Sequence, residues 1–237
     1  MSHLVLNIPH CSRVIPEELK ADILLSDDVL KDELDLMTDT DTDKLYTGYD
    51  SVVAKVSRLV CDTERFLDID AEPMEKRGMG AVYTQTATGK QLRLFDADKR
   101  QKLLEKYYHP YHDRLNELVT GKLEKYGKCL IIDCHSYSND LPFIESYEDV
   151  CIGFCDYHTD MKLVETIAER FRSHGYSVGL NKPFSGTIVP LTYYGKNDRV
   201  QSVMFEINKQ IYTKSQADFD KVKKIIDELL ASFASSA

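Results

Sequence analysis

A series of short apolar runs, separated by segments of helical periodicity, constrains the fold of this chain most strongly. Five runs rich in Val, Ile, Leu, Cys or Phe have the length and composition of buried strands, and a weaker sixth lies at 177–180. The five span residues 4–8, 57–61, 129–134, 150–154 and 201–207. Helical spacing is found at 43–56, at 96–126 with a bend at Pro110, at 159–174 and at 216–233. This alternation predicts an α/β fold with a central mixed, mostly parallel sheet flanked by helices.

Length and charge narrow the functional classes. The 237 residues suit one domain, 1–237, and the net charge of −9 disfavours a nucleic-acid partner. No apolar run reaches the length of a membrane span, and the N-terminus has no basic segment of the signal-peptide kind. The six cysteines form no C-x-x-C pair and lie mostly in apolar runs, as reduced buried thiols do. We therefore expect a cytoplasmic protein that acts on a small molecule and has neither a membrane nor a nucleic-acid partner.

Histidine and carboxylate side chains occur where predicted strands end. His10 follows the first run, His135 closes the run at 129–134, and Glu206 interrupts the apolar run at 201–207. Ligands of open α/β sheets bind at the carboxyl ends of strands, and a buried glutamate needs either a partner or a function. Two histidines and one carboxylate hold a catalytic zinc ion, and a separate glutamate can serve as general base. The acidic ligand could come from the run that holds Asp39, Asp41 and Asp43.

Each of these residues also has a structural explanation. A histidine after a strand can be a hydrogen-bonding loop residue, the acidic run can cap a helix, and Glu206 can pair with a core cation. The acidic run lacks the glycine and glutamate of a calcium loop. His109 and His112 would share one helix face, either at a kinked surface or near substrate. Arg58 and Arg65 flank the end of the 57–61 run and suit either a substrate carboxylate or a structural salt bridge.

Seven motifs, in this order, resemble those of N-formylglutamate amidohydrolases. The resemblance spans about residues 5–212, nearly the whole chain. Any one motif is weak evidence, but their common order is strong evidence. The motifs are Pro9-His10-Cys11-Ser12, Thr42-Asp43-Lys44-Leu45-Tyr46, Ser57-Arg58 with Asp62 and Arg65, His109-Pro110-Tyr111-His112, Asp133-Cys134-His135-Ser136, Asn181-Lys182-Pro183-Phe184-Ser185-Gly186 and Phe205-Glu206-Ile207-Asn208.

The resemblance implies a fold, a cofactor and an activity. The family is distantly similar to zinc carboxypeptidases and aspartoacylase, which share a three-layer, phosphorylase/hydrolase-like α/β fold. It implies one Zn²⁺, or another divalent metal, per chain and hydrolysis of the carbon–nitrogen amide bond of a small N-acyl amino acid, N-formyl compounds among them. The metal ligands would be His10, His135 and Asp43, with Asp39 as second choice.

The resemblance also assigns roles around the metal. Glu206 would activate a metal-bound water and protonate the leaving amine. Arg65 would bind the substrate carboxylate, and Asn181 and His112 would line the substrate pocket. In the mechanism that we expect, Arg58 or His112 would stabilise the oxyanion.

One departure from the family concerns the substrate. Family members read Asp-Leu-Asn-Arg where this chain reads Asp62-Thr63-Glu64-Arg65, so Glu64 adds a negative charge. This charge would disfavour a dicarboxylate unless Glu64 turns away or pairs with Arg58.

Two other functions remain as hypotheses. One is a non-catalytic relative that binds a metal or a small acid. The other is a cysteine amidase using Cys134 or Cys11, although adjacent strand residues such as Cys134 and His135 point to opposite faces.

Overall fold

The computed structural model describes residues 2–145 and 147–235. Six strands form one sheet in the order β2-β1-β3-β6-β4-β5. Strands β2, β1, β3 and β6 are parallel, whereas β4 runs antiparallel to β6 and parallel to β5. The predicted mixed, mostly parallel sheet is thus confirmed. The strands are β1 Leu4–Ile8, β2 Ser51–Val53, β3 Cys129–Tyr137, β4 Val150–Gly153, β5 Val178–Leu180 and β6 Val200–Asn208.

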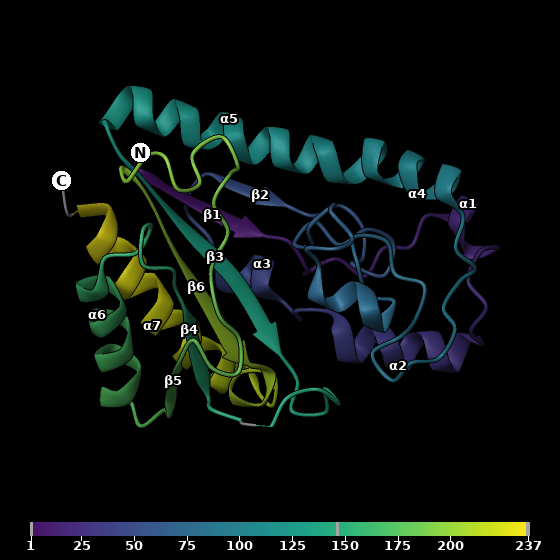
Figure 1. Ribbon diagram of the computed structural model, residues 1–237. Helices are drawn as coiled ribbons and strands as arrows, with labels where there is room; N and C mark the ends of the chain where they lie inside the picture. Colours follow the sequence, from purple (N-terminus) through teal and green to yellow (C-terminus); the bar gives the residue numbers. More distant parts are fainter. Residues whose placement is uncertain (1, 146, 236–237) are drawn as a thin grey trace.

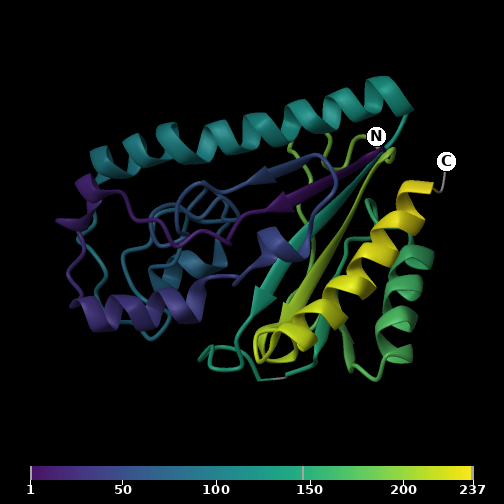
Figure 2. The same ribbon diagram turned by 180° about the vertical axis from the view of Figure 1, so that it is seen from behind.

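Helices cover both faces of the sheet and give the molecule three layers (Figures 1 and 2). The α-helices are α1 Glu17–Lys20, α2 Asp27–Met37, α3 Thr42–Leu45, α4 Ala97–Leu103, α5 His109–Tyr126, α6 Met161–Ser173 and α7 Gln216–Ser235, and the shorter helical segments are η1 Pro73–Arg77, η2 Leu104–Tyr108 and η3 Lys209–Ile211. Alternate residues of β1, β3 and β6 pack against α6 and α7 in the largest apolar cluster. Strand residues that point to the other face of the sheet pack against α5, whose buried face is formed by Tyr111, Leu115 and Val119. None of the helices in the described part of the chain is long and apolar enough to cross a membrane.

Two predicted elements differ from the structure. Residues 57–61 form turns and not a strand, and the predicted helix at 43–56 is reduced to α3 followed by β2. The short run Ser51–Val53 pairs with β1 as an edge strand because its middle residue, Val52, packs beneath α5. The 57–61 run is nevertheless buried, with Leu59 and Val60 fully covered. Apolar sequence therefore identified burial there, but not the backbone conformation.

The predicted helical segment at 96–126 forms one continuous rod (Figure 1), and a π-helical stretch precedes Pro110 where the sequence predicted a bend. Leu104–Tyr108 forms wider turns between α4 and α5. Pro110, in the first turn of α5, has no N–H to donate to the carbonyl four residues earlier, and a π-helical stretch accommodates this loss without ending the helix. The α4–α5 rod therefore continues beyond the sheet. Together with α2, it encloses the irregular segment that follows β2 (Figures 1 and 2).

Candidate active site

The candidate site forms where β1 and β3 end beside the irregular segment. His135 lies near the carboxyl end of β3, and His10 follows β1 by two residues. Because β1 and β3 are parallel neighbours, their carboxyl ends bring both imidazoles to the same edge of the sheet. Asp39 reaches them from the connection between α2 and α3. All three residues are buried, with 4% exposure or less.

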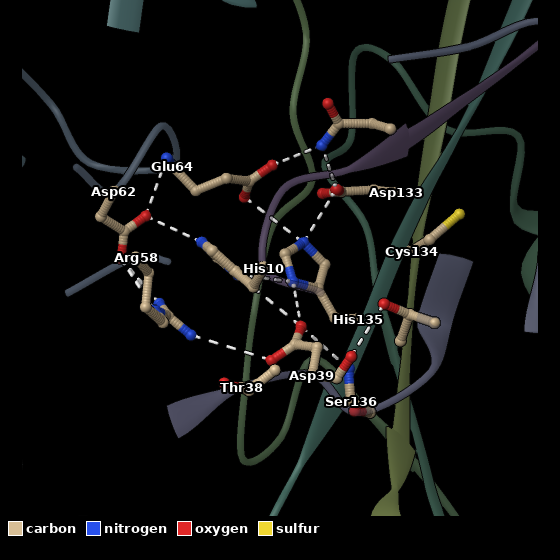
Figure 3. Close-up of polar contacts among 12 residues, drawn as sticks. His10, Thr38, Asp39, Arg58, Asp62, Glu64, Asp133, Cys134, His135 and Ser136 are labelled. Carbon is tan, nitrogen blue, oxygen red and sulfur yellow. Dashed lines mark hydrogen bonds and ion pairs between the residues drawn. The ribbon is translucent and has the colours of Figure 1, made fainter. Parts of the chain in front are cut away.

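The two imidazoles and the Asp39 carboxylate point at one another (Figure 3). His10 Nδ1 lies 3.3 Å from His135 Nδ1 and 3.6 Å from Asp39 Oδ2, and His135 Nδ1 lies 3.2 Å from Asp39 Oδ2. Asp39 Oδ2 also accepts a hydrogen bond from the backbone N–H of Ser136 at 3.1 Å. The three ligand-type atoms thus form a small triangle inside the protein.

The structure brings Asp39, and not Asp43, to the imidazoles. Asp43 is solvent-exposed in α3, whereas Asp39 belongs to the group that could hold a metal. The N–H of Asp39 donates to the carbonyl of His10 at 3.0 Å, which fixes the Asp39 backbone beside the first histidine. Asp39, the second choice from the sequence, therefore lies where the acidic metal ligand was expected, because α3 turns the Asp43 side chain outward.

A buried carboxylate holds the outer nitrogen of each imidazole. His10 Nε2 lies 2.8 Å from Asp62 Oδ1, and His135 Nε2 lies 2.9 Å from Asp133 Oδ1 (Figure 3). Asp62 and Asp133 are fully buried. An Nε2–H that donates to a carboxylate leaves Nδ1 with its lone pair facing the triangle, which is the arrangement found in metal-binding histidines.

The ionisation of these groups is strongly coupled to their surroundings. Burial opposes ionisation of Asp39, but the imidazoles of His10 and His135 close to its carboxylate outweigh it and lower the pKa of Asp39. The pKa of Asp62 is also held well below its usual value, because Arg58, Arg65 and His10 outweigh its burial. Both carboxylates are therefore anionic at neutral pH.

The geometry and donor set fit a divalent cation. A tetrahedral zinc ion with bonds of about 2.0–2.1 Å separates its ligand atoms by about 3.3–3.4 Å. The three distances in the triangle are 3.2, 3.3 and 3.6 Å. If both outer nitrogens carry the proton, two lone pairs and one carboxylate oxygen converge on one point, and these repel one another without a cation. His10, Asp39 and His135 therefore suit a metal of the zinc type.

Glu206 lies beside this triangle on the neighbouring strand. It is in register with His135 across the parallel β3–β6 pair, so the two side chains project from the same face of the sheet. Its side chain is buried at 8% exposure, and Oε2 has no hydrogen-bond partner among the described residues. Burial raises the pKa of Glu206 to about 8. A carboxyl group poised near neutrality, with a free oxygen, is suited to accepting and donating a proton.

Arg58 and Arg65 both lie at the site, anchored by the same aspartate. Arg58 donates from Nε and Nη2 to Asp62 Oδ2 at 3.0 and 2.8 Å, and its Nη1 lies 3.9 Å from Asp39 Oδ1. Arg65 donates to the carbonyls of Met79 and Glu64, and its Nη2 lies 3.6 Å from Asp62. The salt bridge to Asp62 that the sequence suggested is therefore present, and both arginines line the cavity described below.

Two residues expected near substrate have other partners in the structure. His112 Nε2 lies 2.8 Å from the carbonyl of Thr63, and burial lowers the pKa of His112. Asn181 adopts a positive φ of 51°, and its amide bonds the backbone of Phe154 and Gly186. Neither residue lines the cavity described below, so their contacts are those of loop supports.

A cavity of about 240 Å³ opens over the triangle. Its polar lining comprises His10, Asp39, Arg58, Glu64, Arg65, His135, Ser136, Tyr137, Ser185 and Glu206. Its apolar lining comprises Leu36, Met37, Leu141, Phe143, Phe184 and Met204. This volume suits a small molecule. The predicted catalytic glutamate, both predicted arginines and the two histidines therefore share one cavity.

Sequence reasoning missed a supporting network behind His135. Asn7 Nδ2 donates to Asp133 Oδ1 at 2.9 Å and to Glu64 Oε1 at 2.6 Å, and Tyr111 donates to Asn7 Oδ1 at 2.7 Å. Asn7 is a polar residue inside the apolar run of β1, which is the one sequence signal that could have identified it.

This network leads to a first prediction. Replacing Asp133 by asparagine keeps the shape but removes the negative charge that makes His135 a strong ligand. We expect metal affinity to fall by about 10–100-fold, as measured by competition with a chromogenic chelator. The same substitution at exposed Asp227 in α7 serves as the control and should leave affinity unchanged. Equal affinities in the two variants would remove Asp133 from the metal site.

Comparison with solved structures places the chain in a class of α/β proteins that includes an amidohydrolase. The N-formylglutamate amidohydrolase from Ralstonia eutropha JMP134 superposes with a TM-score of 0.80 and 22% identity, over 98% of this chain and 94% of that one. A gene product from Agrobacterium tumefaciens gives a TM-score of 0.70 and 18% identity, over 98% and 91%.

Sequence comparison then gives the family. Residues 2–213 match the family model of N-formylglutamate amidohydrolase, so the chain belongs to that family. An N-formylglutamate deformylase from Pseudomonas putida is 25% identical over 235 residues, covering 91% of this chain and 84% of that protein. The resemblance seen in the sequence is confirmed, and the chain is an amidohydrolase by family.

Proposed function

We propose that this protein is a metal-dependent amidohydrolase that cleaves the amide bond of a small N-acyl amino acid, N-formyl compounds among them. One observation carries the proposal. Two Nδ1 atoms and one carboxylate oxygen converge within 3.6 Å of one another in a cavity that also holds the unpartnered oxygen of Glu206. Family membership supports the reaction class.

His10, Asp39 and His135 would hold the metal. When bound, such an ion lowers the pKa of water and polarises a carbonyl. Asp62 and Asp133 keep the two imidazoles in the tautomer that presents Nδ1.

Glu206 supplies the proton transfers. Its free oxygen accepts a proton from the attacking water, and the resulting carboxyl group donates that proton to the leaving amine nitrogen. Met204, on the same face of β6 as Glu206, lines the cavity beside it, and burial of the carboxyl group maintains its high proton affinity.

The arginines orient the substrate. Arg58 Nη1 makes no hydrogen bond to a described residue and faces Asp39, so it can donate to the oxygen that becomes negative during attack. Arg65 also lines the cavity, and its guanidinium would bind the substrate's α-carboxylate.

A chelation experiment tests the proposal against a cysteine mechanism. Cys134 is fully buried on the opposite face of β3, its pKa is raised well above the usual value by burial, and burial raises that of Cys11 to about 12. Thiolates are thus scarce near the cavity. We expect chelators to abolish hydrolysis of N-formyl amino acids, zinc to restore it, and iodoacetamide at pH 7.5 to leave it unchanged.

The opposite pattern, with activity insensitive to chelators and lost on alkylation, would overturn the proposal. A protein that binds one metal tightly but hydrolyses none of a broad panel of N-acyl amino acids would instead be a non-catalytic relative.

A further inference from the structure

The cavity over the metal triangle has two unlike walls. One wall carries the charged side chains of Arg58, Glu64 and Arg65, all from the segment after β2. The other part of the lining, the apolar wall, comes from the end of α2, the loop after β3, the turn after β5 and strand β6, which contribute Leu36, Met37, Leu141, Phe143, Phe184 and Met204. A bound molecule therefore meets both charged groups and hydrocarbon.

Of the two arginines in the charged wall, one is available to pair with a substrate carboxylate. Among the residues that the structure describes, Arg58 and Arg65 are the only arginine or lysine side chains lining the cavity. Arg58 is held by two hydrogen bonds to Asp62. Arg65 donates to two carbonyls and to the Tyr83 hydroxyl, and it approaches Asp62 only to 3.6 Å. One carboxylate of a substrate can be matched, and a second would be desolvated without a counter-charge.

Glu64 strengthens this restriction. Its side chain is 15% exposed and lines the cavity, with Oε1 accepting from Asn7 at 2.6 Å and Oε2 lying 3.4 Å from His135 Nε2. It makes no contact with Arg58 among the described interactions, and these bonds hold it at the cavity wall. A second carboxylate on a substrate would approach an acidic group there, and like charges brought together are disfavoured.

The apolar wall is fixed by its own packing. The Phe184 ring packs edge-on against Tyr137 with centroids 5.2 Å apart, and the guanidinium of Arg77 lies 5.5 Å above the ring of Phe143, outside the cavity lining. These contacts hold two aromatic rings toward the cavity. An apolar substrate side chain that enters removes its own surface and that of the wall from water.

We infer that this site selects N-acyl amino acids that carry a single carboxylate and an apolar side chain, such as leucine or phenylalanine, over acyl derivatives of acidic amino acids. This inference rests on the proposed function and names its substrate class. Arg65 takes the α-carboxylate, the side chain lies on the wall formed by Phe143 and Phe184, and Glu64 excludes a second carboxylate.

The test compares N-formyl-L-leucine and N-formyl-L-phenylalanine with N-formyl-L-glutamate on the zinc-loaded enzyme. We expect kcat/KM to favour the apolar substrates by at least about tenfold, the usual discrimination of a pocket of this kind. Ser185 is exposed and lies next to Phe184 in the cavity lining, so Ser185→Arg adds a further cation without disturbing the core. This variant should shift the ratio toward N-formyl-L-glutamate by about tenfold. Ser173→Arg, at an exposed position of α6, is the matched control and should not.

Calorimetry separates this inference from the proposed function. The products L-leucine and L-glutamate are titrated into the zinc-loaded protein, with leucine expected to bind more tightly. A preference for N-formyl-L-glutamate would overturn the inference and leave the proposed function standing. If no N-acyl amino acid is hydrolysed, the proposed function fails, but the titration still tests the selectivity of the site. Tighter leucine binding upholds the selectivity, and tighter glutamate binding overturns it.

Discussion

Replacing Glu206 by glutamine should reduce kcat by about 10²–10⁴-fold while leaving the metal content unchanged. The amide keeps the size of the side chain but cannot take a proton from water. Glu206 is not a member of the His10–Asp39–His135 group, so the ligand set survives the change. Loss of turnover without loss of metal would be the signature of a general base.

The measurement pairs kinetics with elemental analysis. Glu165 in α6 is exposed and remote from the cavity, and Glu165→Gln is the matched control that should retain full activity. The glutamine side chain has no buried charge to desolvate, so the variant should fold at least as well as the parent protein. Near-normal kcat in Glu206→Gln would exclude Glu206 from proton transfer.

The second large effect is expected at Asp39. Changing it to asparagine removes an anionic ligand from the triangle but keeps an oxygen for the N–H of Ser136. Metal affinity should fall further than in Asp133→Asn, for which a loss of about 10–100-fold is expected. Activity at limiting zinc should fall with it. Asp43→Asn, four residues away on the surface of α3, should change neither quantity.

The two variants decide which acidic residue serves the site. Metal-binding isotherms for both, together with circular dichroism to verify folding, give the answer directly. A large loss in Asp43→Asn with little effect in Asp39→Asn would mean that α3 rearranges when metal binds.

The sequence predicted the sheet well because most of its strands are encoded locally. The residues of β3 and β6 are mostly apolar, and the predicted runs start within one residue of the observed strands. The short edge strand β2 was missed, because three residues carry little periodicity and owe their pairing to β1. Helix α2 was also missed, although Ser26 followed by Asp27 and Asp28 is a helix-start signal.

The part of the site that lies at strand ends could be predicted from the sequence. His10, His135 and Glu206 lie where apolar runs meet polar residues, and their approach follows from parallel neighbouring strands. Asp39 could not be chosen over Asp43 because the choice depends on how the turn before α3 orients each side chain. Asp41, in that turn, adopts a positive φ of 58°, which no periodicity reveals. The contacts of His112 and Asn181 depend on loop packing in the same way.

Asp62 accepts bonds from His10, Arg58 and Tyr83 and stands close to Arg65. One fully buried side chain therefore joins the metal-ligand wall to the substrate-cation wall. A change at either arginine would be transmitted to the first histidine, so natural or laboratory evolution has little freedom on that side. New substrate preferences should arise instead by substitutions at apolar lining residues such as Phe143 and Phe184, whose described ring contacts do not involve Asp62.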